Sequence, residues 1–160
     1  MDVRVEYSWP VLEQGGRVPD ACDLFLAWAR EEDREDTVDK EGYAKYLLSN
    51  ILNGSYVIIV AYVDDNPAGM LGAHVIYDPS ISARIGIGER LYILPQYRAQ
   101  GVLGPLLDAT DTVGAEVGIT EFVASFRSKD HRLKDMYERR GYTETNVVMR
   151  KGVYDYTKRD

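Results

Sequence analysis

Six segments of the chain have the apolar pattern of β-strands. In residues 3–8 apolar and polar positions alternate, which is typical of a strand with one buried face. Residues 56–63 are instead almost continuous in β-forming residues, which predicts a strand covered on both faces. The six predicted strands are residues 3–8, 56–63, 68–77, 83–93, 121–125 and 143–150.

Four further segments have the period of three to four residues that is typical of amphipathic helices. A loop over residues 10–19 precedes the first helix, and Pro105 fits the third helix only in its first turn. The predicted helices start at Asp20, Asp39, Gly104 and Asp130. In chain order the elements are a strand, two helices, three strands, a helix, a strand, a helix and a strand, which predicts a mixed α/β domain.

Composition narrows the class of protein. The 160 residues, 45% hydrophobic and 28% charged, predict one globular domain with a core of about residues 1–151 and a loosely held tail at 152–160. The net charge of -7 disfavours nucleic acid or an anionic membrane as a partner. The only cysteine, Cys22, excludes an internal disulfide. We find no secretory leader and no apolar run long enough to span a membrane, so we expect a cytoplasmic protein.

The stretch 91–107, L-Y-I-L-P-Q-Y-R-A-Q-G-V-L-G-P-L-L, turns from a strand into a helix. Pro95 ends the strand, and Gly101 and Gly104 allow a tight turn. A helix N-terminus leaves N–H groups unpaired and carries partial positive charge, so the stretch predicts an anion site. The spacing fits neither the nucleoside triphosphate loop nor the dinucleotide loop.

This stretch resembles the acetyl-CoA loop of the GNAT N-acetyltransferase superfamily, whose motif reads roughly R/Q-x-x-G-x-G/A between an apolar strand and a helix. Leu103 stands where the family has a small residue, and Gly104 follows one position later. The residues that match are Ile93, Pro95, Arg98, Gln100, Gly101, Leu106 and Leu107.

The resemblance spans the whole chain and implies an α/β (α+β) protein with the GNAT acyl-CoA N-acyltransferase fold, a central mixed, mostly antiparallel sheet flanked by helices. It also implies that acetyl-CoA is the acyl donor, with no metal. The residues implied to bind the coenzyme are Tyr92, Ile93, Leu94, Arg98, Ala99, Gln100, Gly101, Val102, Leu103, Gly104, Asp130 and Tyr137.

A second family motif lies near the C-terminus, where Tyr137, Gly141 and Tyr142 match and Asp130 replaces the usual Asn. The resemblance implies direct acyl transfer to an amine, with Tyr137 as hydrogen-bond donor or general acid. At pH 7 a lysine-like amine costs on the order of 4.6 kcal/mol to deprotonate. Some group must accept that proton, and the resemblance implies Glu89 as the candidate base, because GNAT enzymes often carry a glutamate on the strand before the loop.

Both catalytic assignments have structural alternatives. Glu89 could be a surface residue paired with Arg84 or Arg90, and Tyr137 could simply pack its ring. The two histidines, His74 and His131, are expected to be structural or exposed, although His74 could face the acceptor.

Other side chains are weaker candidates. Cys22 lacks the partners of a nucleophile, and no metal-ligand spacing occurs. Three tyrosines could line an amine pocket: Tyr7, Tyr77 and Tyr92.

These observations predict an N-acetyltransferase that acts on a small amine or a lysine-bearing acceptor. The acidic run 31–36 is either a solvated helix end or a lip that attracts a cationic acceptor. Two alternatives stay open: a non-catalytic domain that binds coenzyme or protein, and O-acyl transfer to a hydroxyl. The last strand and the tail could also pair across a homodimer.

Overall fold

Five strands form one curled sheet in the computed structural model, which describes residues 1–8, 17–127, 129–149 and 151–152. The strands follow one another in the sheet in the order of the chain, and every pairing is antiparallel except β4 with β5, which is parallel. They are β1 (Val3–Ser8), β2 (Tyr56–Val63), β3 (Asn66–Asp78), β4 (Ala83–Ile93) and β5 (Ile119–Val123). The prediction of a mixed, mostly antiparallel sheet is confirmed.

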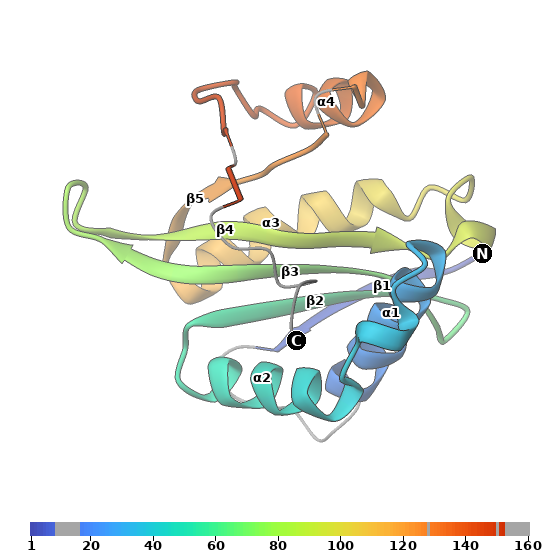
Figure 1. Ribbon diagram of the computed structural model, residues 1–160. Helices are drawn as coiled ribbons and strands as arrows, with labels where there is room; N and C mark the ends of the chain where they lie inside the picture. Colours follow the sequence, from blue (N-terminus) through green and yellow to red (C-terminus); the bar gives the residue numbers. More distant parts are fainter. Residues whose placement is uncertain (9–16, 128, 150, 153–160) are drawn as a thin grey trace.

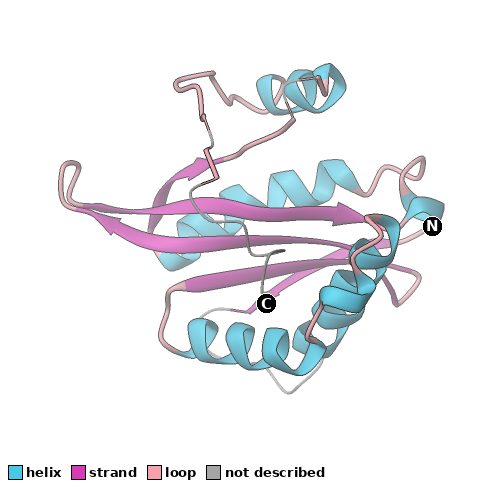
Figure 2. Ribbon diagram, in the orientation of Figure 1, coloured by secondary structure: helices cyan, strands magenta, loops and turns pink. Residues whose placement is uncertain are grey.

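Helices cover both faces of this sheet (Figure 1). Helices α1 and α2 lie against one face and α3 lies against the other. Helix α4 follows β5 on the side of α3 (Figure 2). The helices are α1 (Arg17–Glu31), α2 (Lys40–Leu52), α3 (Leu103–Val117) and α4 (His131–Glu138). Two short 3-10 turns, Glu35–Thr37 and Pro95–Tyr97, precede α2 and α3.

The core is divided in two by the sheet, and β2 contributes to both halves. Val57 and Ile59 pack with α3, whereas Ile58 and Val60 pack with α1 and α2. All eight residues of β2 are buried, which confirms the prediction of a strand covered on both faces. Side chains on both faces of β2 therefore anchor the sheet. At the other end of the sheet, β4 and β5 pair over only part of their length.

Three predicted starts are wrong, and that of β3 is Asn66 rather than Ala68. Helix α1 begins at Arg17, so Asp20 lies in its first turn and is not the N-cap; its carboxylate instead accepts a hydrogen bond of 2.7 Å from the Tyr62 hydroxyl. Pro19 does not end the preceding loop, because a proline is tolerated in a first helical turn, where the N–H has no partner. The strand predicted at 121–125 lies two residues earlier, at Ile119–Val123.

The predicted last strand is also wrong over its described part, residues 143–149, which form no strand. Val147, Val148 and Met149 are 83%, 75% and 91% exposed, so the apolar alternation there meets no described sheet edge. Arg150, the loop residues 10–16 and the tail residues 153–160 lie outside the described residues.

The other two predicted N-caps, Asp39 and Asp130, are confirmed. Asp39 accepts a hydrogen bond from the Gly42 N–H at 2.9 Å, and Asp130 accepts one from the Leu133 N–H at 3.0 Å. Gly118 follows α3 in the left-handed conformation that ends many helices. Asp130 thereby fixes the start of α4, the helix that carries Tyr137.

Candidate active site

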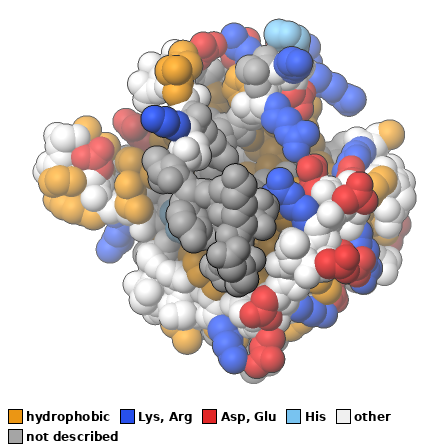
Figure 3. Space-filling view, viewed as in Figure 1, with side chains coloured by type: hydrophobic (Ala, Val, Ile, Leu, Met, Phe, Trp, Pro, Cys, Tyr) orange, Lys and Arg blue, Asp and Glu red, His pale blue; other side chains and the backbone are white. Residues whose placement is uncertain are grey.

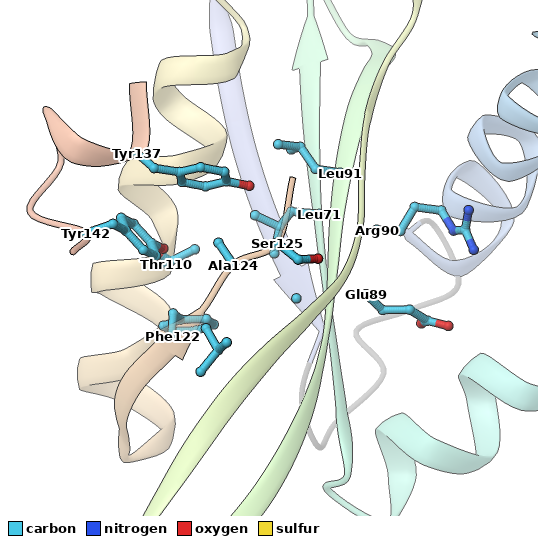
Figure 4. Close-up of a pocket in the computed structure, with 12 residues that line it drawn as sticks. Leu71, Glu89, Arg90, Leu91, Thr110, Phe122, Ala124, Ser125, Tyr137 and Tyr142 are labelled. Carbon is cyan, nitrogen blue, oxygen red and sulfur yellow. The ribbon is translucent and has the colours of Figure 1, made fainter. Parts of the chain in front are cut away.

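A gap opens in the sheet between β4 and β5. The two strands pair only from Arg84 to Ile87, after which β4 continues to Ile93 without β5 beside it. Side chains from β4, α3, α4 and the segment after β5 line the resulting pocket (Figure 4). They include Leu91, Thr110, Ala124, Ser125 and Tyr137.

A β-bulge lies in β4 at the edge of this gap. Gly72 of β3 is opposite Arg90 and Ala73 is opposite Gly88, so Glu89 has no residue opposite it. The side chains of Glu89 and Arg90 both extend toward the α1 and α2 face, away from the pocket (Figure 4). The bulge thus turns Glu89 out of the regular alternation of the strand.

Glu89 belongs to a polar cluster on that face. Its Oε2 accepts a hydrogen bond of 2.7 Å from the Tyr56 hydroxyl and lies 3.7 Å from Nε2 of His74. The same His74 nitrogen is 3.2 Å from the Tyr46 hydroxyl. Glu89 is therefore held by a buried tyrosine, while its side chain and that of His74 stay 31% and 40% exposed.

Tyr137 lies on the opposite side of the gap. Its ring packs against Phe126 and Tyr142, with ring centroids 6.1 and 5.0 Å away, and burial raises its pKa to about 12. Its hydroxyl is directed toward the pocket beside Leu91 (Figure 4). Glu89 and Tyr137 are thus separated by the opening between β4 and β5.

A groove of about 280 Å³ runs from the end of β4 to α4. Hydrophobic side chains form the bottom of this groove, and Lys and Arg side chains surround it (Figure 3). Five of the predicted coenzyme residues line it, namely Tyr92, Ile93, Arg98, Leu103 and Asp130, together with Leu91, Arg132, Leu133 and Met136.

The predicted anion loop lies at one end of the groove. Gly101 has a φ of +72°, a conformation that favours glycine. Within the described chain, no hydrogen bond occupies the backbone N–H groups of residues 101–104, which open α3. A side chain at Gly101 would project into open space, whereas one at Gly104 would meet the Arg140 guanidinium at 2.7 Å. Together these features fit an anionic group such as a pyrophosphate.

The remaining loop residues have mainly structural contacts. Val102 is fully buried, and the Gln100 side chain donates to the Gln96 carbonyl at 2.9 Å. Ala99 lies in the turn that follows the 3-10 segment Pro95–Tyr97. The Leu94 N–H is already used, because it donates to the Ala68 carbonyl of β3 at 2.9 Å. Since amides alternate along a strand, Ile93 rather than Leu94 directs its backbone toward the gap.

Arg98 has a partner that the sequence did not indicate. One of its terminal nitrogens donates to the Glu31 carboxylate at 2.6 Å, and its Nε donates to the Ile93 carbonyl at 3.0 Å. Tyr92 also donates to Glu31, at 2.9 Å. The hydrogen bond from Arg98, more than that from Tyr92, lowers the pKa of Glu31. The first residue of the acidic run is therefore tied to the loop.

Other candidates are not brought together. Tyr7 packs in the core half beside α3, Tyr92 packs in the half beside α1 and α2, and Tyr77 is 63% exposed near the β3–β4 turn. Cys22 is buried, and burial raises the pKa of its thiol. His131 is exposed at the start of α4.

Neither a metal centre nor a membrane-spanning helix occurs in the part of the chain that the structure describes. The described residues contain no cluster of three or more side chains suited to a metal ion. None of their helices is both long and apolar enough to cross a membrane.

Comparison with known proteins assigns the family. Residues 20–142 match the model of the Acetyltransferase (GNAT) family. The chain belongs to this family. The GNAT motifs around Arg98 and Tyr137 both lie within the matched region. A search of curated protein sequences finds no significant match.

Solved structures share the GNAT fold at low sequence identity. An aminoglycoside acetyltransferase, meta-AAC0020, from an uncultured soil metagenomic sample, in complex with sisomicin, superposes with a TM-score of 0.77 at 17% identity, covering 96% of this chain and 97% of its own. AAC(6')-Iy in complex with the bisubstrate analog CoA-S-monomethyl-acetylneamine gives 0.73 at 15% identity, covering 97% and 100%. The ribosomal-protein-alanine N-acetyltransferase from Brucella melitensis biovar Abortus 2308 gives 0.69 at 18% identity, covering 94% and 100%.

Proposed function

We propose that this protein transfers an acetyl group from acetyl-CoA to a primary amine, on a small molecule or on a lysine side chain. The observation that carries the proposal is the gap between β4 and β5, with the carboxylate of Glu89 on one face of the sheet and the Tyr137 hydroxyl on the other. Family membership supports the reaction class. The related structures that bind a CoA bisubstrate analog or an aminoglycoside support coenzyme A and an amine as ligands.

The groove suits the coenzyme. When bound, acetyl-CoA supplies an activated acyl carbon and a sulfur leaving group. The unused N–H groups of residues 101–104 and the Arg98 guanidinium would hold its pyrophosphate, with Ala99 and Gln100 shaping the turn. The wall at Tyr92, Ile93 and Leu94 would guide the rest of the coenzyme toward the gap.

Glu89 is proposed to take the amine proton, directly or through a water. In the transfer, the amine nitrogen forms a bond to the acyl carbon while the carbon–sulfur bond breaks and its electron pair stays on sulfur. Tyr137 is proposed to stabilise the departing sulfur. Its pKa of about 12 lies well above a thiol value of about 8.5, so complete proton transfer would be uphill by about 5 kcal/mol. Hydrogen-bond donation is therefore favoured over full general-acid catalysis.

The test is release of free coenzyme A thiol from acetyl-CoA in the presence of a panel of amines and alcohols. We expect amines to support release, and Glu89→Gln to lower kcat by about a hundredfold or more at neutral pH. Tyr137→Phe should lower kcat and leave the coenzyme Kd unchanged. Full activity of Glu89→Gln would contradict the assignment of the base. Coenzyme binding without turnover of any acceptor would favour the non-catalytic alternative.

A further inference from the structure

The guanidinium of Arg90 has no anionic partner among the described residues. Its central carbon lies 3.9 Å from the centroid of the Trp28 ring and 5.0 Å from that of Phe25. Its Nε is buried and makes no hydrogen bond to any residue that the structure describes. Stacking on aromatic rings stabilises a guanidinium but leaves its N–H groups unpaired, and an unpaired buried donor is costly. Arg90 therefore has the capacity to bind an anion.

Tyr43 of α2 adds a second unpaired donor to the same cluster. Its ring is stacked on Phe25 with centroids 3.8 Å apart, and its hydroxyl is buried without a hydrogen-bond partner in the described part of the chain. Burial raises the pKa of Tyr43, while the charge of Arg90 lowers it and that of Glu89 raises it. The phenol thus stays protonated at neutral pH, and both charges are near enough to act on it.

These donors lie beside the proposed base. Glu89 and Arg90 are consecutive and, because of the bulge, extend to the same face of the sheet (Figure 4). A negative group that is 31% exposed therefore adjoins a positive group with unused donors. The planar guanidinium matches a carboxylate in geometry, and the adjacent Glu89 favours an amine.

We propose that Arg90 and Tyr43 bind a carboxylate of the acceptor, so that the substrate is an amine that also carries a carboxylate, as an amino acid does. The inference rests on the proposed function, because it specifies the acceptor of the same site. It separates this chain from a binder of polycations, since a second ammonium group near Arg90 would be repelled. Sisomicin, found on a structural relative, is therefore expected to be a poor acceptor here.

The test compares kcat/KM for matched pairs of amines, one member with a carboxylate and the other with a carboxamide. Suitable pairs are glycine, β-alanine, 4-aminobutanoate and lysine, each with its amide. The carboxylate also changes the amine pKa, so the informative quantity is the preference ratio in the wild type divided by that in Arg90→Gln. This quotient cancels the intrinsic reactivity of each amine.

For at least one pair, we expect the wild type to prefer the carboxylate by about 10- to 100-fold relative to Arg90→Gln. Arg90→Lys should keep part of the preference, because it keeps the charge without the planar fork. Tyr43→Phe removes only a hydroxyl, should lose a smaller part, and carries the test if Arg90→Gln does not fold.

Two results would overturn the inference. One is an unchanged preference ratio in both Arg90→Gln and Tyr43→Phe. The other is turnover of sisomicin but of no carboxylate-bearing amine. Thermal stabilisation by acetyl-CoA separates the two proposals: a normal shift of the wild type with no carboxylate preference refutes this inference alone, whereas no shift and no turnover refute the proposed function as well.

Discussion

The Tyr56 hydroxyl holds the proposed base, Glu89, and displacing this hydroxyl has a predictable cost in stability and activity. A methyl group at Gly72 would overlap the Tyr56 hydroxyl oxygen and lie 2.9 Å from the ring carbon that bears it. Tyr56 is fully buried, and its hydroxyl donates to Glu89 at 2.7 Å. Gly72→Ala must therefore displace the hydroxyl from Glu89.

The magnitude follows from the two contacts. Overpacking of a buried site costs about 1–3 kcal/mol, and a hydrogen bond to a charged group contributes about 1.5–3 kcal/mol. Because Glu89 is partly exposed, the lower end applies to the hydrogen bond. Tyr56→Phe loses that bond alone. In the Tyr56→Phe background, Gly72→Ala should cost less stability than in the wild type. Without the hydroxyl, the closest atom to the added methyl group is the ring carbon at 2.9 Å.

The assay is a double-mutant cycle by urea denaturation, with kcat measured on the same four proteins. We expect a coupling free energy of about 1 kcal/mol or more between the two sites, and kcat lowered by either single change. Equal costs of Gly72→Ala in the wild-type and Tyr56→Phe backgrounds would show that the methyl group does not meet the Tyr56 hydroxyl.

Three further predictions concern the groove and its helix. Glu31→Gln should lower the Kd for coenzyme A by about two- to fivefold in titration calorimetry, since it frees Arg98 from a carboxylate that repels phosphate; weaker binding would instead make Glu31 a positioning residue. Because the folded pKa of Tyr137 is raised to about 12, its stabilising contribution is complete below pH 10 and is lost as the pH rises from 10 to 12. The free energy of unfolding of Tyr137→Phe, measured in urea, should fall less steeply with pH over that interval than that of the wild type. The same slope in both proteins would contradict this. Asp130→Ala should cost about 1 kcal/mol, read as a fall in Tm of about 2–4 °C, by removing the cap on Leu133, whereas Asp130→Asn should be nearly neutral.

The strands with strong apolar patterns could be predicted from the sequence because their burial depends on local composition. Residues 56–63 predicted the bounds of β2, including its burial on both faces. The same reasoning failed at 143–149, because an apolar pattern indicates a strand only where its side chains are buried, and Val147, Val148 and Met149 are exposed. Helix α1 started earlier than predicted since its first turn accommodates Pro19.

Only those site residues that belong to a local sequence motif could be predicted. The loop around Gly101 has the positive φ and the unused amides that its glycine and its position before a helix indicated. The contact of Arg98 with Glu31 joins residues 67 positions apart, and no local pattern reports such a pairing. Likewise, the bulge at Glu89 depends on the register of β3 against β4, which the sequence of one strand does not determine.

The proposed function depends on binding of the acetyl-CoA pyrophosphate by the loop at residues 101–104, which a thermal-shift assay tests. Gly101→Glu places a negative charge at the site, and Gly101→Gln is the matched control, because both side chains enter open space and bear the same strain at positive φ. Acetyl-CoA at 100 times its Kd should add about 2.7 kcal/mol, which raises the Tm by about 5–10 °C. We predict this shift for the wild type, most of it for Gly101→Gln, and almost none for folded Gly101→Glu. No shift of the wild type at millimolar acetyl-CoA or coenzyme A, or an equal shift in both variants, would contradict binding by this loop.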